Sequence, residues 1–600
     1  MAPPSDFAGY PPAQEGPRSE YVPVITNNPV LSGLPLSIVA TIVSKLPMLQ
    51  QYYWSNAGFG RLSQMPELDD MPSRYHPVVT PLGERGPMLE FGPDLVEPKY
   101  TSLGSRYYTV SEYHALYKSG RATPLQVIEA LLPLTKRGKD QSQYADAWAD
   151  TYDEGQLAIK AAKASTERYA AGKPLGILDG VPIGVKDDVH VEGHVSHNGV
   201  GYDPTLPAFK VQEESAWPIK KLQEAGAIVL GKNTMHQLGS DTCGCNPTQG
   251  TATNHLNKAY YPGGSSSGGS SALSTGIVPF VVGSDAGGSA RIPAIYNGVY
   301  GLKTTHHRTM THDMTNAVVT PLAATVADLT IAYRVMSQPN PDCPVQGRFA
   351  LSLPPSPTAK RVMGIYRDWW KDADPTVVQV CDQAIDYFSG KLGYEVIDIS
   401  IPCISEARTA HSVLCISEMV TAAYVRSGRR SNWLDMFNPA AKLSLSVAQR
   451  TPAADFIKCC AMRELLMRHL AFLFQKHPGL LIMTPVSPII GWPRTPGDDV
   501  YGTTDTNLTI KNMMYVFLAN MTGTPALAAP VGYVDPDKGQ GKLPIGLMAT
   551  AEWGCEEQLL SWASEAEAYL NDVYEGGRRK PETWLDVMDL VTKNDKPTTD

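Results

Sequence analysis

Three short stretches of the sequence combine serine, glycine and lysine in a pattern that could perform nucleophilic catalysis. They are GVPIGVKDD around Lys186, YPGGSSSGGSSALSTG from Tyr261 to Gly276, and GSDAGGSARIP around Ser289. A serine hydroxyl is a weak nucleophile and needs a base within hydrogen-bond reach. A lysine can be that base only when it is neutral, and burial lowers the pKa of an amine by disfavouring its charged form. The apolar residues before Lys186 predict such a buried setting.

Two of these stretches also have a simpler interpretation. A glycine-serine run such as Tyr261 to Gly276 is typical of a flexible linker, because it lacks the side chains that pack a core. Lys186 could equally pair with Asp187 or Asp188 on a surface turn. The neighbouring sequence must therefore decide whether these stretches form a catalytic site or only a linker and a turn.

Two further motifs indicate other chemistries, but their context disfavours both. GAIVLGKN, residues 226–233, spells G-x-x-x-x-G-K, yet Asn233 stands where a phosphate-binding loop has Ser or Thr, and the residues between the glycines favour a strand. Gly264, Ser266 and Gly268 form G-x-S-x-G, the nucleophile elbow of α/β-hydrolases, which requires a buried strand before the serine. The preceding NHLNKAYYPGG is polar and rich in turn residues, so the elbow remains only the rival serine-hydrolase interpretation.

Alternating helices and apolar strands surround these stretches and must position them. Apolar residues at helical spacing predict helices within 107–134, 156–172, 214–226 and 375–392. Apolar runs at 180–189, 227–233, 277–285, 479–489 and 524–534 predict buried strands. The Pro-rich passage 339–360 is interpreted as a surface connection inside one domain. The pattern predicts an α/β fold with a largely buried sheet.

Composition excludes some functions and cellular settings. The 51 basic and 60 acidic residues give a net charge of −9 without long blocks of like charge, so no footprint for nucleic acid is visible. Nine scattered cysteines in a chain of 600 residues predict reduced thiols in a cytoplasmic protein. Cys243 and Cys245 form a C-x-C, but no second pair lies at zinc-like spacing, so we expect no metal site.

The N-terminal region is expected to differ from the rest of the chain. Residues 1–20 lack a signal-peptide pattern and are predicted to be a disordered tail. Residues 21–105 are predicted to be a helical N-terminal extension, and 106–600 the catalytic domain. The apolar segment from Leu31 is interrupted by Pro35, Lys45 and Pro47, so it is too short to span a bilayer. It could instead lie on a membrane as an amphipathic helix or pack against its own protein or a second subunit.

Five segments of the chain, taken in order, closely resemble the signature of the amidase signature family. They are GVPIGVKDD, GGSSSGG, IVPFVVGSD, AGGSARIP and YGLKTT. The resemblance runs from about Tyr107 to the C-terminal region. Three further segments are similar to plant-type fatty acid amide hydrolases: GKNTMHQLGSDTCGCNPTQGTATN, YGLKTTHHRT and LSGLPLSIVATIVSKLP. The fold it implies has a large mixed central sheet covered by helices on both faces. His307, Cys243 and Cys245 depart from the usual residues of these relatives, which puts substrate preference in doubt.

The resemblance also implies roles for individual residues. Ser289 would be the nucleophile, Lys186 the base, and Ser265, 24 positions before Ser289, the bridging serine held in a cis peptide. Ser266 would be a supporting hydroxyl. The N–H groups of the run Ala286, Gly287, Gly288 and Ser289 would form an oxyanion hole. Asp285 and Arg291 would brace the nucleophile loop through charge-assisted hydrogen bonds, and His236 would be structural or line the pocket.

These roles predict an amidase that works through an acyl-enzyme and needs no metal or organic cofactor. Fatty acid amides or other hydrophobic amides are the substrates that the resemblance suggests, with an acyl channel built from the N-terminal segment and WLDMF at 433–437. A small-amide or carbamate hydrolase, a catalytically inactive binding protein and a glutamine amidotransferase subunit remain alternatives. The expected partners are a small-molecule amide substrate and no nucleic acid, with peripheral membrane contact and a homodimer left open.

Overall fold

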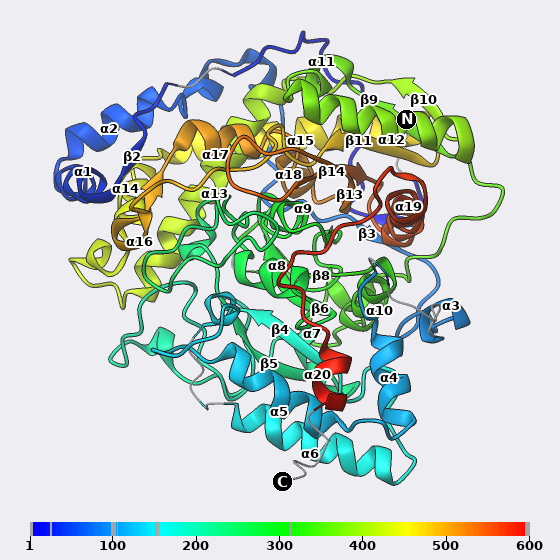
Figure 1. Ribbon diagram of the computed structural model, residues 1–600. Coiled ribbons are helices and arrows are strands. Elements are labelled where there is room, and N and C mark those ends of the chain that lie inside the picture. The colour runs from blue at the N-terminus through cyan, green and yellow to red at the C-terminus, as the bar shows by residue number, and fades with distance from the viewer. Residues whose placement is uncertain are drawn as a thin grey trace.

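The computed structural model describes residues 4–593 except 25–26, 98–103, 105, 150–152, 154 and 313. Its centre is a ten-stranded mixed sheet of order β10-β9-β11-β14-β13-β7-β8-β6-β4-β5 (Figure 1). The strands are β4 (Pro182–Lys186), β5 (Ile228–Asn233), β6 (Phe280–Asp285), β7 (Tyr300–Lys303), β8 (Val318–Ala323), β9 (Val362–Ile365), β10 (Glu395–Asp398), β11 (Leu480–Pro485), β13 (Ala526–Val534) and β14 (Leu543–Thr550).

Parallel pairing occurs at the two ends of this sheet and antiparallel pairing in its middle. β10, β9 and β11 run parallel at one end, and β6, β4 and β5 at the other. The pairs from β11 through β14, β13, β7 and β8 to β6 are antiparallel. Every strand except β10, at the edge, is buried along its whole length. Because successive side chains point to opposite faces, the sheet is covered on both faces, as predicted.

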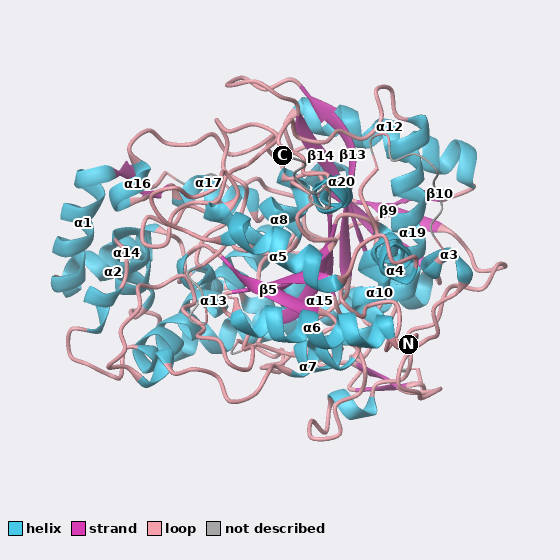
Figure 2. Ribbon diagram, turned by 60° about the horizontal axis from the view of Figure 1, so that its bottom comes forward, coloured by secondary structure: helices cyan, strands magenta, loops and turns pink. Residues whose placement is uncertain are grey.

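Helices provide that cover and also build the end of the molecule away from the sheet (Figure 2). They are α1 (Gly33–Lys45), α2 (Pro47–Asn56), α3 (Pro93–Val96), α4 (Val110–Lys118), α5 (Pro124–Thr135), α6 (Gln156–Ala170), α7 (Trp217–Glu224), α8 (Ser267–Ser274), α9 (Arg291–Tyr296), α10 (Val326–Met336), α11 (Arg367–Trp370), α12 (Pro375–Leu392), α13 (Ile404–Arg426), α14 (Pro439–Ala448), α15 (Ala453–Lys476), α16 (Asp498–Tyr501), α17 (Thr506–Asn512), α18 (Phe517–Thr522), α19 (Glu556–Ala568) and α20 (Val587–Lys593). The helices predicted within 107–134, 156–172, 214–226 and 375–392 are all present.

The glycine-serine stretch is not a linker, because its second half is the buried helix α8. Every residue of SGGSSALS is buried. A Cβ at Gly268 would lie 2.3 Å from the carbonyl oxygen of Ala147, and one at Gly269 would lie 3.0 Å from Val281. The small residues therefore allow α8 to pack closely against its neighbours, including β4 and β6.

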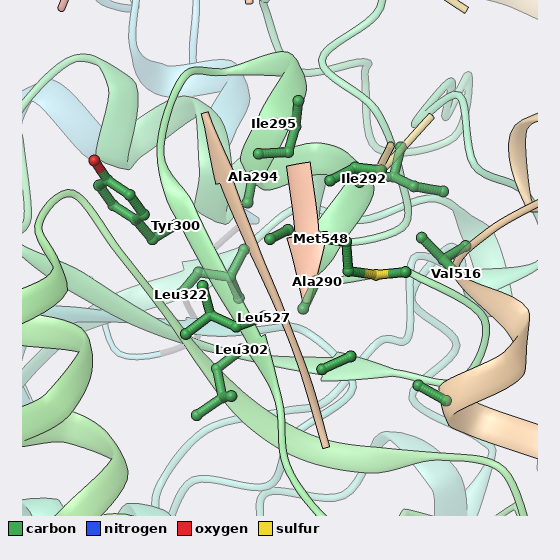
Figure 3. Close-up of a cluster of buried hydrophobic side chains, with 14 of the residues drawn as sticks. Ala290, Ile292, Ala294, Ile295, Tyr300, Leu302, Leu322, Val516, Leu527 and Met548 are labelled. Carbon is green, nitrogen blue, oxygen red and sulfur yellow. The ribbon is translucent and has the colours of Figure 1, made fainter. Parts of the chain in front are cut away.

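Short helix α9 anchors the predicted nucleophile loop in the largest apolar core. Ile292, Ala294 and Ile295 of α9 pack with side chains from the sheet, among them Leu302 and Met548 (Figure 3). A Cβ at Gly546 of β14 would lie 2.5 Å from Ile295, so this glycine lets the helix rest on the sheet. The loop just before α9 is thereby held on a rigid base.

The prediction of a disordered tail over residues 1–20 is wrong for residues 4–20. Short strand β1 (Phe7–Ala8) pairs with β3 (Thr80–Pro81). The Tyr10 hydroxyl donates to Glu552 at 2.6 Å, and the Gln14 N–H donates to Arg468 O at 3.1 Å. All of these partners are distant in the sequence, and those of Tyr10 and Gln14 lie hundreds of residues away, so local composition could not reveal them. Residues 1–3 lie outside the described residues.

The extension at 21–105 is less helical than predicted. Besides α1, α2 and α3 it contains loops, 3₁₀ turns and strand β2 (Leu31–Ser32), which pairs with β12 (Thr503–Thr504). α1 packs on α14, and both figures place α1 and α2 at one end of the molecule (Figures 1 and 2). Within the described residues no single helix is long and apolar enough to cross a bilayer. α1 and α2 reach that length only together, with a bend of 110° between them.

Candidate active site

Two neighbouring parallel strands bring the predicted catalytic residues together. Lys186 is the last residue of β4, and Ser289 follows soon after β6 ends at Asp285. The carboxyl ends of parallel neighbours lie at the same edge of a sheet, so the residues that follow them meet there. Ser265 and Ser266 reach this edge from the segment that leads into α8.

Lys186 is at the centre of a buried hydrogen-bond network. Its Nζ donates to Ser265 Oγ at 2.8 Å and to Ser284 Oγ at 2.7 Å. A carboxylate oxygen of Asp188 lies 3.4 Å from the same nitrogen and accepts a hydrogen bond from Ser284 Oγ at 2.6 Å. The predicted contact between Lys186 and Ser265 is present, and Ser284 is an additional partner that the sequence did not predict.

The environment of Lys186 makes its ammonium group easier to deprotonate than that of a lysine in water. Its side chain is 2% exposed, and burial lowers its pKa below the ordinary value of 10.5. The carboxylates of Asp188 and Asp285 act in the opposite direction, but the pKa of Lys186 remains lowered. A buried amine with a lowered pKa is what a lysine base requires.

The interpretation of Lys186 as part of a surface turn is wrong. The neighbouring Asp187 is buried and faces away, where its carboxylate accepts the N–H groups of His197 and Gly199 at 3.0 Å each. Burial alone would raise the pKa of Asp187, but the hydrogen bonds and nearby positive charge hold it well below its usual range. Asp188 does pair with Lys186, inside the protein and not on a turn in solvent.

The loop from Ala286 to Ser289 presents N–H groups and a hydroxyl beside this network. The Gly288 N–H donates to Asp285 Oδ1 at 2.8 Å, which removes it from the donors available to a substrate oxyanion. The N–H groups of Ala286, Gly287 and Ser289 have no partner within the described part of the chain. Ser289 is 7% exposed, and its Oγ makes no hydrogen bond there either, so no hydrogen bond joins it to Ser265.

Asp285 and Arg291 brace this loop in the core and do not form a surface ion pair. Arg291 Nε and Nη2 donate to the two carboxylate oxygens of Asp285 at 3.0 and 2.9 Å, and both side chains are fully buried. Asn520 donates to the same carboxylate at 3.0 Å and accepts from Arg291 at 2.6 Å. Burial alone would raise the pKa of Asp285, but Arg291 and these hydrogen bonds hold it well below its usual range. Asp285 precedes the loop and Arg291 follows it, so this buried ion pair holds both ends of the loop in place.

Ser265 and Ser266 connect the glycine-serine segment to the nucleophile loop. The peptide bond between Gly264 and Ser265 is cis, as the family resemblance predicted. The Ser266 N–H donates to Ser289 O at 3.1 Å, and its hydroxyl lies 3.5 Å from Ser284 O. Ser266 thus joins two loops, which agrees with a supporting role.

A cavity of about 270 Å³ opens onto this network. Its polar end includes Ser265, Ser284, Ala286 and Gly287. Its apolar walls come from the N-terminal extension and from helices α13, α14 and α17; the residues are Leu31, Val39, Tyr53, Ala57, Phe59, Ile416, Met419, Ala422, Leu443, Leu445, Val447, Ala448, Ile510 and Met513. The cavity therefore combines polar groups of this network with a wall of apolar side chains.

Several residues that the sequence associated with this cavity lie elsewhere. Trp433 and Phe437 of WLDMF do not line the cavity, whereas the N-terminal segment does; they pack behind it, in an apolar cluster with the lining residues Met419 and Leu445. His307, Cys243 and Cys245 do not line it either. His307 has φ +72°, the left-handed conformation that glycine adopts without strain, so its departure from the usual glycine concerns the backbone.

The other candidate sites of the sequence do not form the predicted structures. Ser266 precedes α8 but follows a loop and no strand, so the nucleophile elbow is wrong. Residues Ile228–Asn233 are the buried strand β5, and Lys232 Nζ donates to the Val189 carbonyl, so no phosphate loop exists there. His236 is buried, does not line the cavity and lies 3.8 Å from Cys243 Sγ.

His411 and Ser284 are site residues that the sequence analysis missed. His411 of α13 lines the cavity, and its Nε2 lies 2.8 Å from the carbonyl oxygen of Ala286. Nothing near His411 in the sequence connects it to a loop 125 positions earlier. Ser284 lies in GSD, directly before Asp285, and its position at the end of an apolar strand beside β4 was the one available signal.

The mixed-sheet α/β fold and the buried pair of Lys186 and Ser265 indicate a hydrolase that uses serine chemistry, but not one with the α/β-hydrolase fold. The family model described as Amidase matches residues 131–560, and the chain belongs to the amidase signature family, whose members act on amide bonds. A fatty acid amide hydrolase of Medicago truncatula is 31% identical over 81% of this chain and 80% of its own length. A glutamyl-tRNA(Gln) amidotransferase subunit of Thermus thermophilus is 28% identical over 75% of this chain and 94% of its own length.

Solved structures share the same fold. A bacterial aryl acylamidase of the amidase signature family superimposes with a TM-score of 0.65 at 20% identity, over 81% of this chain and 98% of its own. The ten-stranded mixed sheet is therefore the amidase signature fold that the sequence predicted.

Proposed function

We infer that the protein hydrolyses long-chain fatty acid amides, with Ser289 as nucleophile, Ser265 as bridging serine and Lys186 as base. One observation supports this substrate class most directly: a single cavity is lined both by Ser265, which contacts the buried Lys186, and by a large set of apolar side chains. Leu31 and Val39 extend that wall into the N-terminal extension. The similarity to a plant fatty acid amide hydrolase supports the same proposal.

In the proposed reaction, neutral Lys186 accepts a proton from Ser265, which takes the proton of Ser289 as its Oγ attacks the amide carbon. The oxyanion accepts hydrogen bonds from the N–H groups of Ala286, Gly287 and Ser289. The C–N bond then breaks, the amine leaves with the proton returned through Ser265, and an acyl ester remains on Ser289. Water attacks this ester and releases the acid, and the scheme uses no metal or cofactor. Catalytic hydrogen bonds are often long before substrate binds, and we expect the contact between the two serines to form then.

The test compares three substrates on purified protein: a long-chain N-acylethanolamine, a short amide and ethyl carbamate, with Ser289→Ala as the blank. We expect kcat/KM to be highest for the long chain and to vanish in the blank. Preference for the short amide or for the carbamate would establish the small-amide or carbamate alternative. Release of ammonia from glutamine only with a partner protein would establish the amidotransferase alternative.

We also propose that the N-terminal helices rest on a lipid surface. Leu34, Ile38 and Ile42 follow at four-residue spacing along α1 and are 56, 51 and 46% exposed, and Met48 of α2 is 86% exposed. Val39, on the same helix, lines the cavity, so this apolar face is continuous with the proposed route of a membrane-dissolved substrate.

Co-sedimentation with phosphatidylcholine vesicles tests this contact. We expect Ile38→Asp to abolish binding that the unchanged protein shows, while fluorophosphonate labelling of Ser289 persists. A dimer in solution that Ile38→Asp converts to a monomer, without vesicle binding, would assign the face to a homodimer instead.

A further inference from the structure

Asp241 is an acidic side chain on the wall of the catalytic cavity. Within the described residues, hydrogen bonds reach only one of its carboxylate oxygens. Oδ1 lies 2.5 Å from the N–H of Thr242, which donates to it, and accepts the Thr509 hydroxyl at 3.0 Å. Oδ2 accepts no hydrogen bond from the described part of the chain, and Asp241 is only partly buried, so this oxygen is available to a molecule in the cavity.

No ion pair in the described part of the chain compensates this carboxylate. Asp188, the other carboxyl group on the cavity wall, pairs with Lys186, whereas within the described residues Asp241 forms no ion pair. Burial raises the pKa of Asp241 to about 6, and the negative charge of the nearby Asp505 acts in the same direction. At the neutral to alkaline pH at which a lysine base works, Asp241 is thus mainly ionised, and a cation or an N–H or O–H donor would compensate it.

The position of Asp241 places it beside the reacting groups. The Gly264 N–H donates to Thr242 O at 2.7 Å, and a Cβ at Gly264 would lie 2.7 Å from the carbonyl oxygen of Asp241. Gly264 directly precedes Ser265, and a Cβ at Gly239 would lie 3.2 Å from Ser265 Oγ. Because Ser265 and Asp241 also line one cavity, we expect a substrate whose amide lies against Ser265 and Ser289 to have Asp241 near its substituents.

We propose that Asp241 is a specificity residue that selects amides carrying a hydrogen-bond donor, above all a cationic one, near the scissile bond. This inference rests on the proposed amide hydrolysis and narrows its substrate class. The apolar wall binds the hydrocarbon, and Asp241 accepts the donor group. A purely hydrocarbon substituent at this position would leave the carboxylate desolvated and unpaired, which is costly.

Three amides of one long acyl chain test the proposal: the N-propyl, N-(2-hydroxyethyl) and N-(2-aminoethyl) amides, which place CH₃, OH and NH₃⁺ at matched positions. We expect kcat/KM of the unchanged protein to be about 10-fold or more higher for the aminoethyl than for the propyl amide, with the hydroxyethyl amide between them. Asp241→Asn removes the charge and should reduce the aminoethyl amide to the level of the hydroxyethyl amide. Asp241→Leu should remove both preferences.

Glu214→Gln is the matched control, because it removes one exposed carboxylate elsewhere and should leave the ranking unchanged. Fluorophosphonate labelling of Ser289 confirms that each variant is folded. Equal rates for the three amides, or an equal loss for all three in Asp241→Asn, would overturn the inference while leaving the proposed function intact. If none of the three is hydrolysed, the proposed function fails. The amides are then compared as competitors of labelling, where the same ranking supports a binding role for Asp241 and equal competition contradicts it.

Discussion

Lys186 and Asp188 lie 3.4 Å apart inside the protein, yet the pKa of the lysine is lowered. The two influences oppose each other, because burial disfavours the ammonium ion and the carboxylate favours it. Ser284 lies between them, in contact with both. Asp188 thus holds the amine in place while limiting how far its pKa falls.

Replacing Asp188 by Asn should move the pH profile of the enzyme. The lysine acts as a base only when it is deprotonated, so kcat/KM rises as pH increases through the pKa of Lys186. Removing the carboxylate removes the influence that raises this pKa, so the rising limb should shift to lower pH. Lys186→Met is the blank and should lose about 10² to 10⁴-fold in kcat. A profile of Asp188→Asn that stays in place or moves to higher pH would contradict the assignment of Lys186 as the base.

Arg291→Met should destabilise the protein strongly, because it leaves the buried carboxylate of Asp285 without its ion pair. Loss of one member of a buried pair commonly costs about 3–5 kcal/mol in the free energy of unfolding. The folded pKa of Asp285 lies below its unfolded value of about 3.9, so the pair contributes fully above that pH and is lost as pH falls through the folded pKa.

Denaturant unfolding above and below pH 4 measures both effects. Arg430→Met is the matched control, because Arg430 pairs with Asp203 at the surface, and we expect no measurable change from it. A loss for Arg291→Met no larger than that of the control would show that the pair does not brace the loop.

The sequence predicts those parts of the fold and site that depend on neighbouring residues, and it misses those that depend on contacts between distant segments. Apolar runs predicted β4, β6 and β13 correctly, and the motifs placed Lys186, Ser265 and Ser289 at one site. Strand β14 and the order of the sheet were not predicted, because strand pairing is set by contacts between distant segments. Helix α8 was not predicted because serine and glycine are weak helix formers, and packing overrides that preference here. Asp188 was considered only as a surface partner, because its burial depends on the strand beside it.

His411 should affect catalysis indirectly, by holding the nucleophile loop in position. Its Nε2 lies 2.8 Å from the Ala286 carbonyl, and burial lowers the pKa of the ring to about 4, so the neutral ring with a proton on Nε2 donates this hydrogen bond at neutral pH. His411→Ala should lower kcat by about 10-fold or more with little change in KM, since the oxyanion donors lose their fixed position. His411→Gln, which keeps an N–H donor, should recover part of the loss. A higher KM with unchanged kcat would instead place His411 in substrate binding.

Met419 provides the test of chain-length selection, because it lines the apolar wall of the cavity from α13. Met419→Trp should fill the space that a long acyl chain needs and lower kcat/KM for a long-chain amide by about 10-fold or more, with little effect on a short amide. Met419→Ala widens the same place and should keep the long-chain activity. A small fluorophosphonate should label Ser289 equally in both variants, which separates a blocked channel from a damaged fold. Equal losses for long and short amides in Met419→Trp would mean that the acyl chain does not pass this residue.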